Sequence, residues 1–375
     1  MEMAEKAAEK QRFRPSFQLT PRQHTWIFAA VAILSVLVYA NSLKNDFVWD
    51  DNELIVDNQS VHSLSSLPAF LAGHFWSQSS QPSARGYYRP VVLLSYALDY
   101  ALWDESPAGF HLTNIILHAL AAALACMLVL QLSRNLAAAL VVGTLFAVHP
   151  VHTESVTFIS GRTDVLATVF VLLSLCLYLA ERGREHLSFR LPLALMFFGF
   201  GLLSKEVAAT LPALLVAVEI ASPSGIPMRK RMLLHAPFWL TLAGYLALRF
   251  GLLRINPQIE GKLSGLEALL TMSTVALDYF RLLLAPLNLC ADYVVNVQRS
   301  ISPLNLAALG ALALGVVLAL LLLMKRRFAG LFLLWIFVCL SPVMHIVPIS
   351  ALKAERFLYL PSVGYCALVG LMGGW

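Results

Sequence analysis

Long apolar segments recur along the whole chain, and they restrict the fold more than any other feature of the sequence. A helix needs about 20 apolar residues to cross the hydrocarbon core of a bilayer. We expect spanning helices at about 26–43, 112–131, 136–148, 164–181, 190–203, 207–221, 232–252, 304–324, 329–345 and 356–375. Composition agrees, because 58% of the 375 residues are hydrophobic and only 13% are charged. The sequence predicts an all-α integral membrane protein with about 10–11 transmembrane helices in one bundle.

Basic residues gather in short connections between the apolar segments. They lie in the N-terminal arm (1–25) and in the connections 181–190, 227–231 and 325–327. Such loops stay on the cytoplasmic side, so they orient the bundle with its N-terminus inside. The net charge of +5 is therefore read as a topology signal, and nucleic acid is not an expected partner.

One apolar segment, 263–287, does not fit a simple span. Glu267, Asp278 and Arg281 interrupt it, and charges are costly at the centre of a bilayer. We predict an interfacial or re-entrant helix there; if the segment does span, a neighbouring span is misassigned. The predicted organisation is a cytoplasmic arm (1–25) and one transmembrane domain (26–375), whose large exported loops are 44–111 and 253–303.

This topology places the remaining polar segments on the non-cytoplasmic face, which we call the exported face. They are the stretches 44–111, 149–164, 204–206, 253–303 and 345–356. Within the first, 63–76 and 88–103 carry apolar residues at helical spacing with Trp and Tyr among them, as in helices that lie on a membrane. We expect these helices to cover a cavity on the exported face, where the chemistry takes place.

Two adjacent acids, Asp50 and Asp51, follow the first span in the stretch NDFVWDDNE (45–53). A solvated helix exit explains one such acid. A carboxylate at the mouth of a bundle can also act as a general base, hold a metal or bind a cationic substrate. The pair is our candidate catalytic site.

His149 and His152 are three residues apart in HPVHTES, with Glu154 next to them. This spacing resembles that of metal ligands, but Pro150 follows the first histidine and no H-E-x-x-H pattern occurs. We assign no metal site. With Arg162, the histidines are expected to present donors to an anion such as a phosphate.

Further charged residues interrupt apolar stretches on the same face. Lys205 and Glu206 form an ion pair with each other or face a ligand, and Arg356 is a snorkelling helix end or a phosphate ligand. Arg89 and Tyr88 precede the second loop helix, where they contact lipid headgroups or substrate. Acids and several cations on one face are what a transferase acting on a lipid phosphate needs.

A series of motifs resembles a known family. The motifs are, in order, NDFVWDDNELIVDN, YYRPVVLLSYALDYALW, GFHLTNIILHAL, LFAVHPVHTESVTFISGRTDVLA, LLSKE, LLLAPLNLCADYVV and AERFLYLPSVGYC. Over about 41–366 the sequence resembles the membrane half of the transmembrane and tetratricopeptide-repeat O-mannosyltransferases. That family has the GT-C fold of the protein O-mannosyltransferases. The chain shows no tetratricopeptide repeats before it ends at Trp375, so it is either a repeat-less relative or a part of a longer chain.

The resemblance implies a glycosyltransferase that moves mannose from a polyprenyl phosphate, dolichyl phosphate in eukaryotes, to a Ser or Thr hydroxyl of a protein. The family's acidic pair falls on Asp50 and Asp51, and one of them takes the acceptor proton in a single inverting displacement. The expected site residues are, for the donor phosphate, Arg162, Lys205, Arg356, His149 and His152, and, for substrate binding, Arg89, Tyr88 and Glu154. No cofactor is expected beyond a divalent cation, which stays open.

A second class of function, a transporter or flippase of a lipid-linked anion, also requires charges within the membrane. Transporters often contain internal repeats, and no duplication is evident in this sequence. Arg outnumbers Lys and the spans are rich in Ala and Leu, which favours a bacterial inner membrane with a periplasmic active face over the endoplasmic reticulum with a lumenal one.

Overall fold

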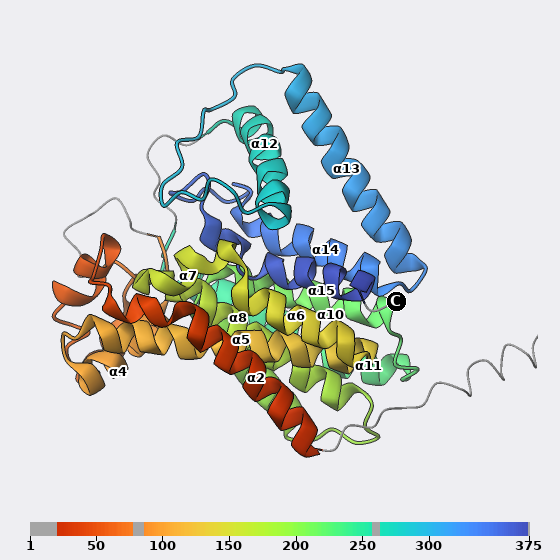
Figure 1. The fold of residues 1–375 in the computed structure, drawn as a ribbon, viewed down its shortest axis with the longest axis horizontal. Coiled ribbons are helices and arrows are strands. Elements are labelled where there is room, and N and C mark those ends of the chain that lie inside the picture. The colour runs from red at the N-terminus through yellow and green to blue at the C-terminus, as the bar shows by residue number, and fades with distance from the viewer. Residues whose placement is uncertain (1–20, 78–85, 257–262, 374–375) are drawn as a thin grey trace, which may run out of the picture.

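The computed structural model describes residues 21–77, 86–256 and 263–373, and within these ranges the chain is helical and has no strands. The predicted arm, 1–25, lies almost entirely outside the described residues. The centre of the bundle consists of α5 (Pro107–Ser133) and α8 (Arg162–Arg182), whose most apolar windows are 61% and 72% buried. Figure 1 shows the other helices arranged around this pair.

The remaining helices surround the centre in chain order. They are α2 (Pro21–Tyr39), α3 (Leu67–Ala72), α4 (Pro90–Trp103), α6 (Leu136–Val148), α7 (Thr153–Thr157), α9 (Arg190–Leu202), α10 (Leu211–Ala221), α11 (Met228–Leu246), α12 (Gly265–Leu284), α13 (Pro303–Met324), α14 (Phe328–Leu340) and α15 (Pro361–Gly373). Short helical turns connect them: η1 (Ala40–Lys44), η2 (Asn52–Val56), η3 (Leu64–Ser66), η5 (Pro150–His152), η6 (Ile159–Gly161), η7 (Glu206–Thr210), η8 (Ala247–Leu252), η9 (Ser341–Val343) and η10 (Glu355–Leu358).

Several helices begin at residues that satisfy their free N–H groups. Asn135 accepts a hydrogen bond from the Ala138 N–H at the start of α6, and Ser264 and Glu267 form a capping box at the start of α12. Proline occupies the first turn of α4, α5 and α13, where its missing N–H costs no hydrogen bond. The sequence therefore sets these boundaries locally.

The predicted class is confirmed, but fewer helices have spanning length than the sequence indicates. In the described residues four helices are long and apolar enough to cross a membrane, or five if α6 and the segment Pro150–Thr157, bent by 50°, form one span. The predicted spans 190–203, 207–221, 329–345 and 356–375 contain helices of only 11 to 13 residues, α9, α10, α14 and α15. Hydropathy had included apolar residues that the structure places in turns such as η7, η9 and η10.

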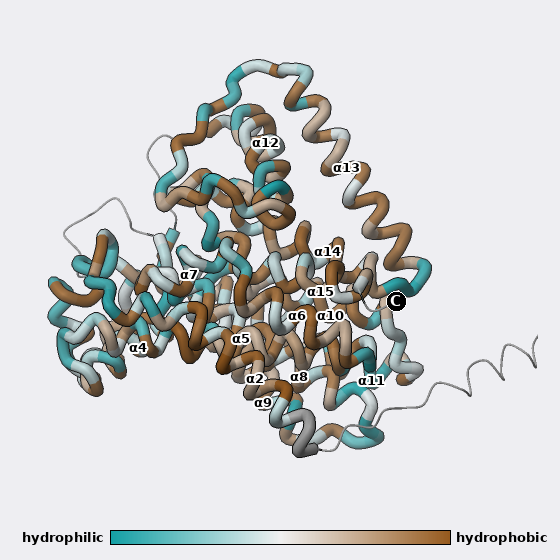
Figure 2. The backbone as a smooth tube through the Cα atoms, viewed as in Figure 1, coloured by the Kyte–Doolittle hydropathy of each residue, from teal (hydrophilic) through white to brown (hydrophobic). Residues whose placement is uncertain are grey.

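Apolar surface covers the outside of the bundle. Figure 2 shows hydrophobic residues along the outer helices, among them α2 and α13. The most apolar windows of these two helices are only 22% and 17% buried, although α13 has the highest mean hydropathy of the candidate spans. Apolar side chains that face outward at this density are typical of contact with lipid.

The two exported loops contain helices of their own. The first has α3 and α4, in the two segments where the sequence predicted helices. The second has α12, which is not among the candidate spans, followed by an extended stretch that leads to α13. In Figure 1, α12 and the start of α13 rise above the remaining helices.

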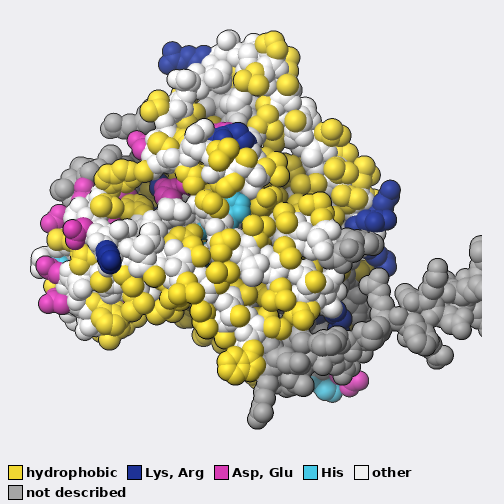
Figure 3. Space-filling view, in the orientation of Figure 1, with side chains coloured by type: hydrophobic (Ala, Val, Ile, Leu, Met, Phe, Trp, Pro, Cys, Tyr) yellow, Lys and Arg dark blue, Asp and Glu magenta, His cyan; other side chains and the backbone are white. Residues whose placement is uncertain are grey.

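The charged side chains divide between the two ends of the bundle. Figure 3 shows acidic side chains at the left, over the loop that carries α4, and Lys and Arg at the right, over the α13–α14 connection. The basic connections also contact one another there: Arg182 and Arg231 both approach Glu219, and the Lys230 ammonium donates to the Glu185 carbonyl. This separation of charge agrees with the predicted orientation.

A cysteine at Ser63, which is exposed in the first loop, should react in intact cells or right-side-out vesicles with a membrane-impermeant thiol reagent. A cysteine at Lys325, exposed in the α13–α14 connection, should react only after permeabilisation. Both variants need a Cys290→Ser background, because Cys290 is the exposed cysteine of the described residues. The reverse pattern would contradict the proposed orientation.

Candidate functional site

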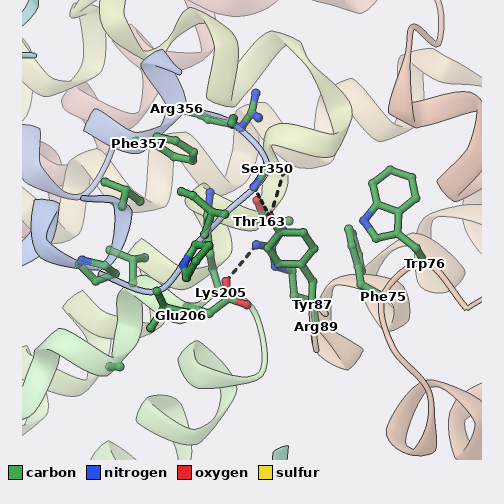
Figure 4. Close-up of a pocket in the computed structure, with 18 of the residues that line it drawn as sticks. Phe75, Trp76, Tyr87, Arg89, Thr163, Lys205, Glu206, Ser350, Arg356 and Phe357 are labelled. Atoms are coloured by element: carbon green, nitrogen blue, oxygen red, sulfur yellow. Dashed lines mark hydrogen bonds and ion pairs between the residues drawn. The ribbon is translucent and has the colours of Figure 1, made fainter. Parts of the chain in front are cut away.

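A cavity of about 680 Å³ opens at the exported end of the bundle. Its wall comes from the first loop, the turn before α8, η7, η8 and the segment between α14 and α15. Figure 4 shows Trp76, Phe75 and Tyr87 on one side of it, and Lys205, Arg356 and Phe357 on the other. Segments that are far apart in the sequence thus meet around one space.

Asp50 lines this cavity. It makes no hydrogen bond or ion pair with the described residues, and Glu53 lines the same space. Desolvation in the cavity raises the pKa of Asp50 above its usual 3.8, although the positive charges of Arg356 and Arg89 act in the opposite direction. An unpaired carboxylate of raised pKa is suited to accept a proton.

Asp51 has a different environment from that of its neighbour. Its side chain is fully buried, and Oδ1 accepts hydrogen bonds from the Ser160 N–H (2.8 Å) and the Ser160 hydroxyl (2.5 Å). Its Oδ2 accepts one from the Val48 N–H (3.2 Å). Asp51 therefore ties the first loop to the turn before α8 and is a positioning residue for Asp50.

Lys205 and Arg356 form the cationic side of the cavity. The Lys205 ammonium and the Arg356 guanidinium lie 5.1 Å and 5.5 Å from the centre of the same Phe357 ring. Lys205 Nζ contacts Asp164 Oδ2 at 2.5 Å, and Arg356 pairs with Glu154. Burial first, and then the charges of Arg89 and Arg356, lower the pKa of Lys205 to about 8 despite Asp164.

Glu206 holds two further cations at the cavity. Its carboxylate contacts Arg89 at 2.9 Å and Arg249 at 3.1 Å. Burial acts to raise the pKa of Glu206, but the two arginines outweigh it and the pKa falls to about 2. Of the two readings of the Lys205–Glu206 pair, the mutual ion pair is wrong, since each residue has a partner from elsewhere in the chain. Figure 4 shows the contact between Arg89 and Glu206.

Apolar residues complete the wall of the cavity. Leu246 and Phe250, from the end of α11 and from η8, line it together with Ile346 and Val347. All four are exposed, Ile346 to 77%. The cavity therefore combines a carboxylate, several cations and an apolar surface, as an amphiphilic substrate with a phosphate group requires.

Arg162 does not line this cavity, which corrects its predicted role in phosphate binding. Its guanidinium is completely buried and contacts Asp99 at 2.5 Å. It also donates to the side chain of Asn114 (2.6 Å) and the carbonyl of Phe110 (2.9 Å). Because all of its donor groups bind within the protein, Arg162 joins α4 and α5 to the start of α8.

The predicted histidines are also structural. His149 is bonded to the Leu283 carbonyl (3.1 Å), and His152 to the Phe146 carbonyl and the Ser362 hydroxyl (both 2.8 Å). Both are buried and outside the cavity lining, so the anion-binding prediction for them is corrected. The described residues contain no group of three or more His, Cys, Asp or Glu side chains placed to hold a metal.

Two predicted substrate contacts lie behind the cavity wall. Tyr88 is buried and donates to the Leu71 carbonyl (2.8 Å), while its neighbour Tyr87 lines the cavity. Glu154 holds Arg356 through its guanidinium and its N–H. Arg89 does line the cavity, stacked on Tyr87 at 4.5 Å.

Arg249 is the main site residue that the sequence analysis did not select. It interrupts the apolar segment 232–252, and an ionisable residue inside a predicted span is a sign of function. Glu53, close behind the two aspartates in the sequence, was also not selected, and it lines the cavity.

The fold and the cavity define a class before any relative is considered: a polytopic helical membrane protein of the GT-C type, with its site at the exported end. The oligosaccharyltransferase of Archaeoglobus fulgidus, solved with a tethered acceptor peptide, has this fold. The two structures align with a TM-score of 0.50 and 13% identity over 94% of this chain and 50% of the archaeal one.

Sequence comparison identifies nearer relatives. The chain is 32% identical over 358 residues to protein O-mannosyl-transferase F38B6.6 of Caenorhabditis elegans, and 28% identical over 380 residues to protein O-mannosyl-transferase TMTC3 of Homo sapiens. It is thus a homologue of the O-mannosyl-transferases, as its motifs predicted. Each match covers 90% of the chain but only 50% and 41% of the relative, and no protein-family model matches.

Replacing Asp51 by Asn should destabilise the protein, because an amide nitrogen cannot accept the hydrogen bonds that Oδ1 and Oδ2 both accept. Loss of a buried hydrogen-bonded acceptor costs about 1–3 kcal/mol. Thermal unfolding of the purified protein in detergent would measure this as a lower Tm. An unchanged Tm would contradict the positioning role.

Proposed function

We propose that the chain forms the catalytic membrane unit of a glycosyltransferase that moves a sugar, mannose, from a polyprenyl phosphate to a Ser or Thr hydroxyl of a protein. The observation that carries the proposal is the cavity itself, in which the unpaired Asp50 shares one space with Lys205 and Arg356 beside an apolar wall. The printed names of the relatives, protein O-mannosyl-transferases, support mannose as the sugar.

The reaction is a single displacement with inversion at the anomeric carbon. The acceptor oxygen forms the new bond to this carbon while the bond from the carbon to the phosphate oxygen breaks. Asp50 takes the hydroxyl proton, and its raised pKa makes it a better base than an ordinary aspartate. General-base catalysis of this kind contributes roughly 10²–10⁴-fold to the rate.

The leaving group is the lipid phosphate, which departs with the electron pair of the broken bond. Lys205 and Arg356, on either side of Phe357, are placed to receive its charge, and Arg89 and Arg249 supply a positive field behind them. Glu154, Asp164 and Glu206 hold these cations in place before the donor arrives.

The two substrates approach from different surroundings. The exposed apolar side chains of Ile346, Val347 and Phe250 face the side from which a polyprenyl chain enters from the membrane. The aromatic wall of the first loop, with Trp76 and Tyr87, faces the aqueous side from which a protein segment enters. We place the reaction on the exported face of a bacterial inner membrane, where the composition of the spans puts it.

A test of the reaction class incubates the purified protein with a panel of radiolabelled polyprenyl-phosphate sugars and a peptide rich in Ser and Thr. Label should move from the mannosyl lipid to the peptide. A transporter, the alternative that the sequence left open, gives no transfer but moves the lipid across proteoliposomes, and this result would overturn the proposal.

Replacing Asp50 by Asn should lower turnover by about 10²–10⁴-fold, because an amide cannot accept the hydroxyl proton. Donor binding and Tm should remain near those of the wild type, since the Asp50 side chain makes no hydrogen bond within the described residues. Asp57→Asn is the matched control, an exposed aspartate of the same loop outside the cavity lining. A fully active Asp50→Asn protein would refute Asp50 as the base.

The rate at limiting donor should follow a bell-shaped pH profile. On the acid side it falls as Asp50 is protonated, at a pH above the usual aspartate value of 3.8 because its pKa is raised. On the alkaline side it falls as pH rises through about 8, where Lys205 loses its charge. Lys205→Arg should move the alkaline limb upward, because a guanidinium stays charged. An alkaline limb unmoved in this variant would show that Lys205 does not set it.

A further inference from the structure

A second hollow lies at the opposite end of the bundle from the catalytic cavity. This groove, of about 600 Å³, lies between the end of α10, the start of α11 and the end of α13. In Figure 1 these three ends meet at the right-hand side, near the C-terminus. Nothing in the proposed transfer reaction uses this end of the molecule.

The only carboxylate among the residues that line the groove already has partners. Glu219 is buried, and its Oε1 accepts from the Tyr178 hydroxyl (3.0 Å) and the Arg182 guanidinium (3.1 Å). Its Oε2 accepts from the Ser224 hydroxyl (2.9 Å). Glu219 therefore has little capacity left to neutralise other cations.

Two arginines of the groove are left with unsatisfied positive charge. Arg231 comes only within 4.0 Å of Glu219, and its Nε has no hydrogen-bond partner although it is buried. Arg326 is exposed and forms no ion pair within the described part of the chain. The two come from the basic connections 227–231 and 325–327, which the groove brings together.

Apolar side chains line the groove beside this charge. Val216 and Ile220 of α10 and Met232 of α11 are exposed to 41%, 42% and 62%. Because α10 and α11 continue from here into the bundle, this apolar strip leads from the charged rim towards the interior of the membrane. A headgroup site above an acyl-chain strip is the arrangement that binds a phospholipid.

We propose that this groove binds an anionic phospholipid of the cytoplasmic leaflet, with its phosphate between Arg231 and Arg326 and an acyl chain along Val216, Ile220 and Met232. Charge complementarity favours an anionic lipid over a zwitterionic one, whose ammonium group would meet the same two arginines. The site is independent of the proposed transferase reaction, because it lies at the other end of the helices.

Native mass spectrometry of the full chain in a neutral detergent can test the site with dioleoylphosphatidylglycerol and dioleoylphosphatidylcholine. The anionic lipid should bind more tightly. Each arginine near an anionic headgroup contributes roughly fivefold to affinity, so Arg326→Gln should weaken binding by about that factor and the Arg231→Gln, Arg326→Gln double variant by about 25-fold. Arg326 has no partner in the described structure, so its variant should fold even if the double variant is destabilised.

The matched control removes two positive charges from the same two connections outside the groove. Arg229 and Arg327 are exposed and do not line it, so Arg229→Gln with Arg327→Gln should leave the affinity for the anionic lipid within about twofold of the wild type. An equal loss in this control, or equal affinity for the two lipids, would overturn the proposal. So would displacement of the lipid by millimolar inorganic phosphate, which would identify a site for a soluble anion.

Discussion

Each cation of the catalytic cavity is held by a carboxylate from another element, and the site depends on this pairing. Asp164 at the start of α8 holds Lys205, Glu154 of α7 holds Arg356, and Glu206 holds Arg89 and Arg249. An unpaired charge in a largely apolar bundle carries a large desolvation cost. The pairs reduce that cost and fix the cations before any substrate is bound, which is the preorganisation that stabilises a developing negative charge.

The two adjacent aspartates show how one turn of chain separates chemistry from support. Asp51 points into the protein and has its oxygens bonded to Ser160 and Val48, whereas Asp50 faces the cavity without a hydrogen bond of its own. The buried acid fixes the backbone from which the free acid projects. We therefore expect variants of the two residues to differ, one losing stability and the other losing turnover.

The two ends of the bundle have opposite characters that follow from the same physics. At the exported end, acids and cations surround a cavity between the loops. At the other end, basic connections converge on Glu219, which neutralises part of their charge and leaves Arg231 and Arg326 for an external anion. The chain spans about half the length of the curated relatives it matches, and both ends of the bundle are complete within that half.

Much of this protein was determined by sequence alone. Apolar segments specified an all-α membrane bundle, basic connections its orientation, and ordered motifs its homology to the O-mannosyl-transferases. The presence of Lys205, Arg356, Arg89 and one of the two aspartates in the site also followed, because charges that interrupt apolar segments need a reason to be there. Helix number did not, since hydropathy cannot separate a span from a short helix followed by an apolar turn.

Tertiary structure alone decided which polar residues face the cavity and which support it. Arg162, His149 and His152 have the residue types of an anion site, yet their partners, Asp99, Leu283 and Ser362, come from distant parts of the chain. Tyr87 and Tyr88, or Asp50 and Asp51, are equivalent in a sequence pattern, but neighbouring side chains point in different directions once the backbone is folded. Which of two neighbours reaches the cavity depends on long-range packing, and no local pattern records it.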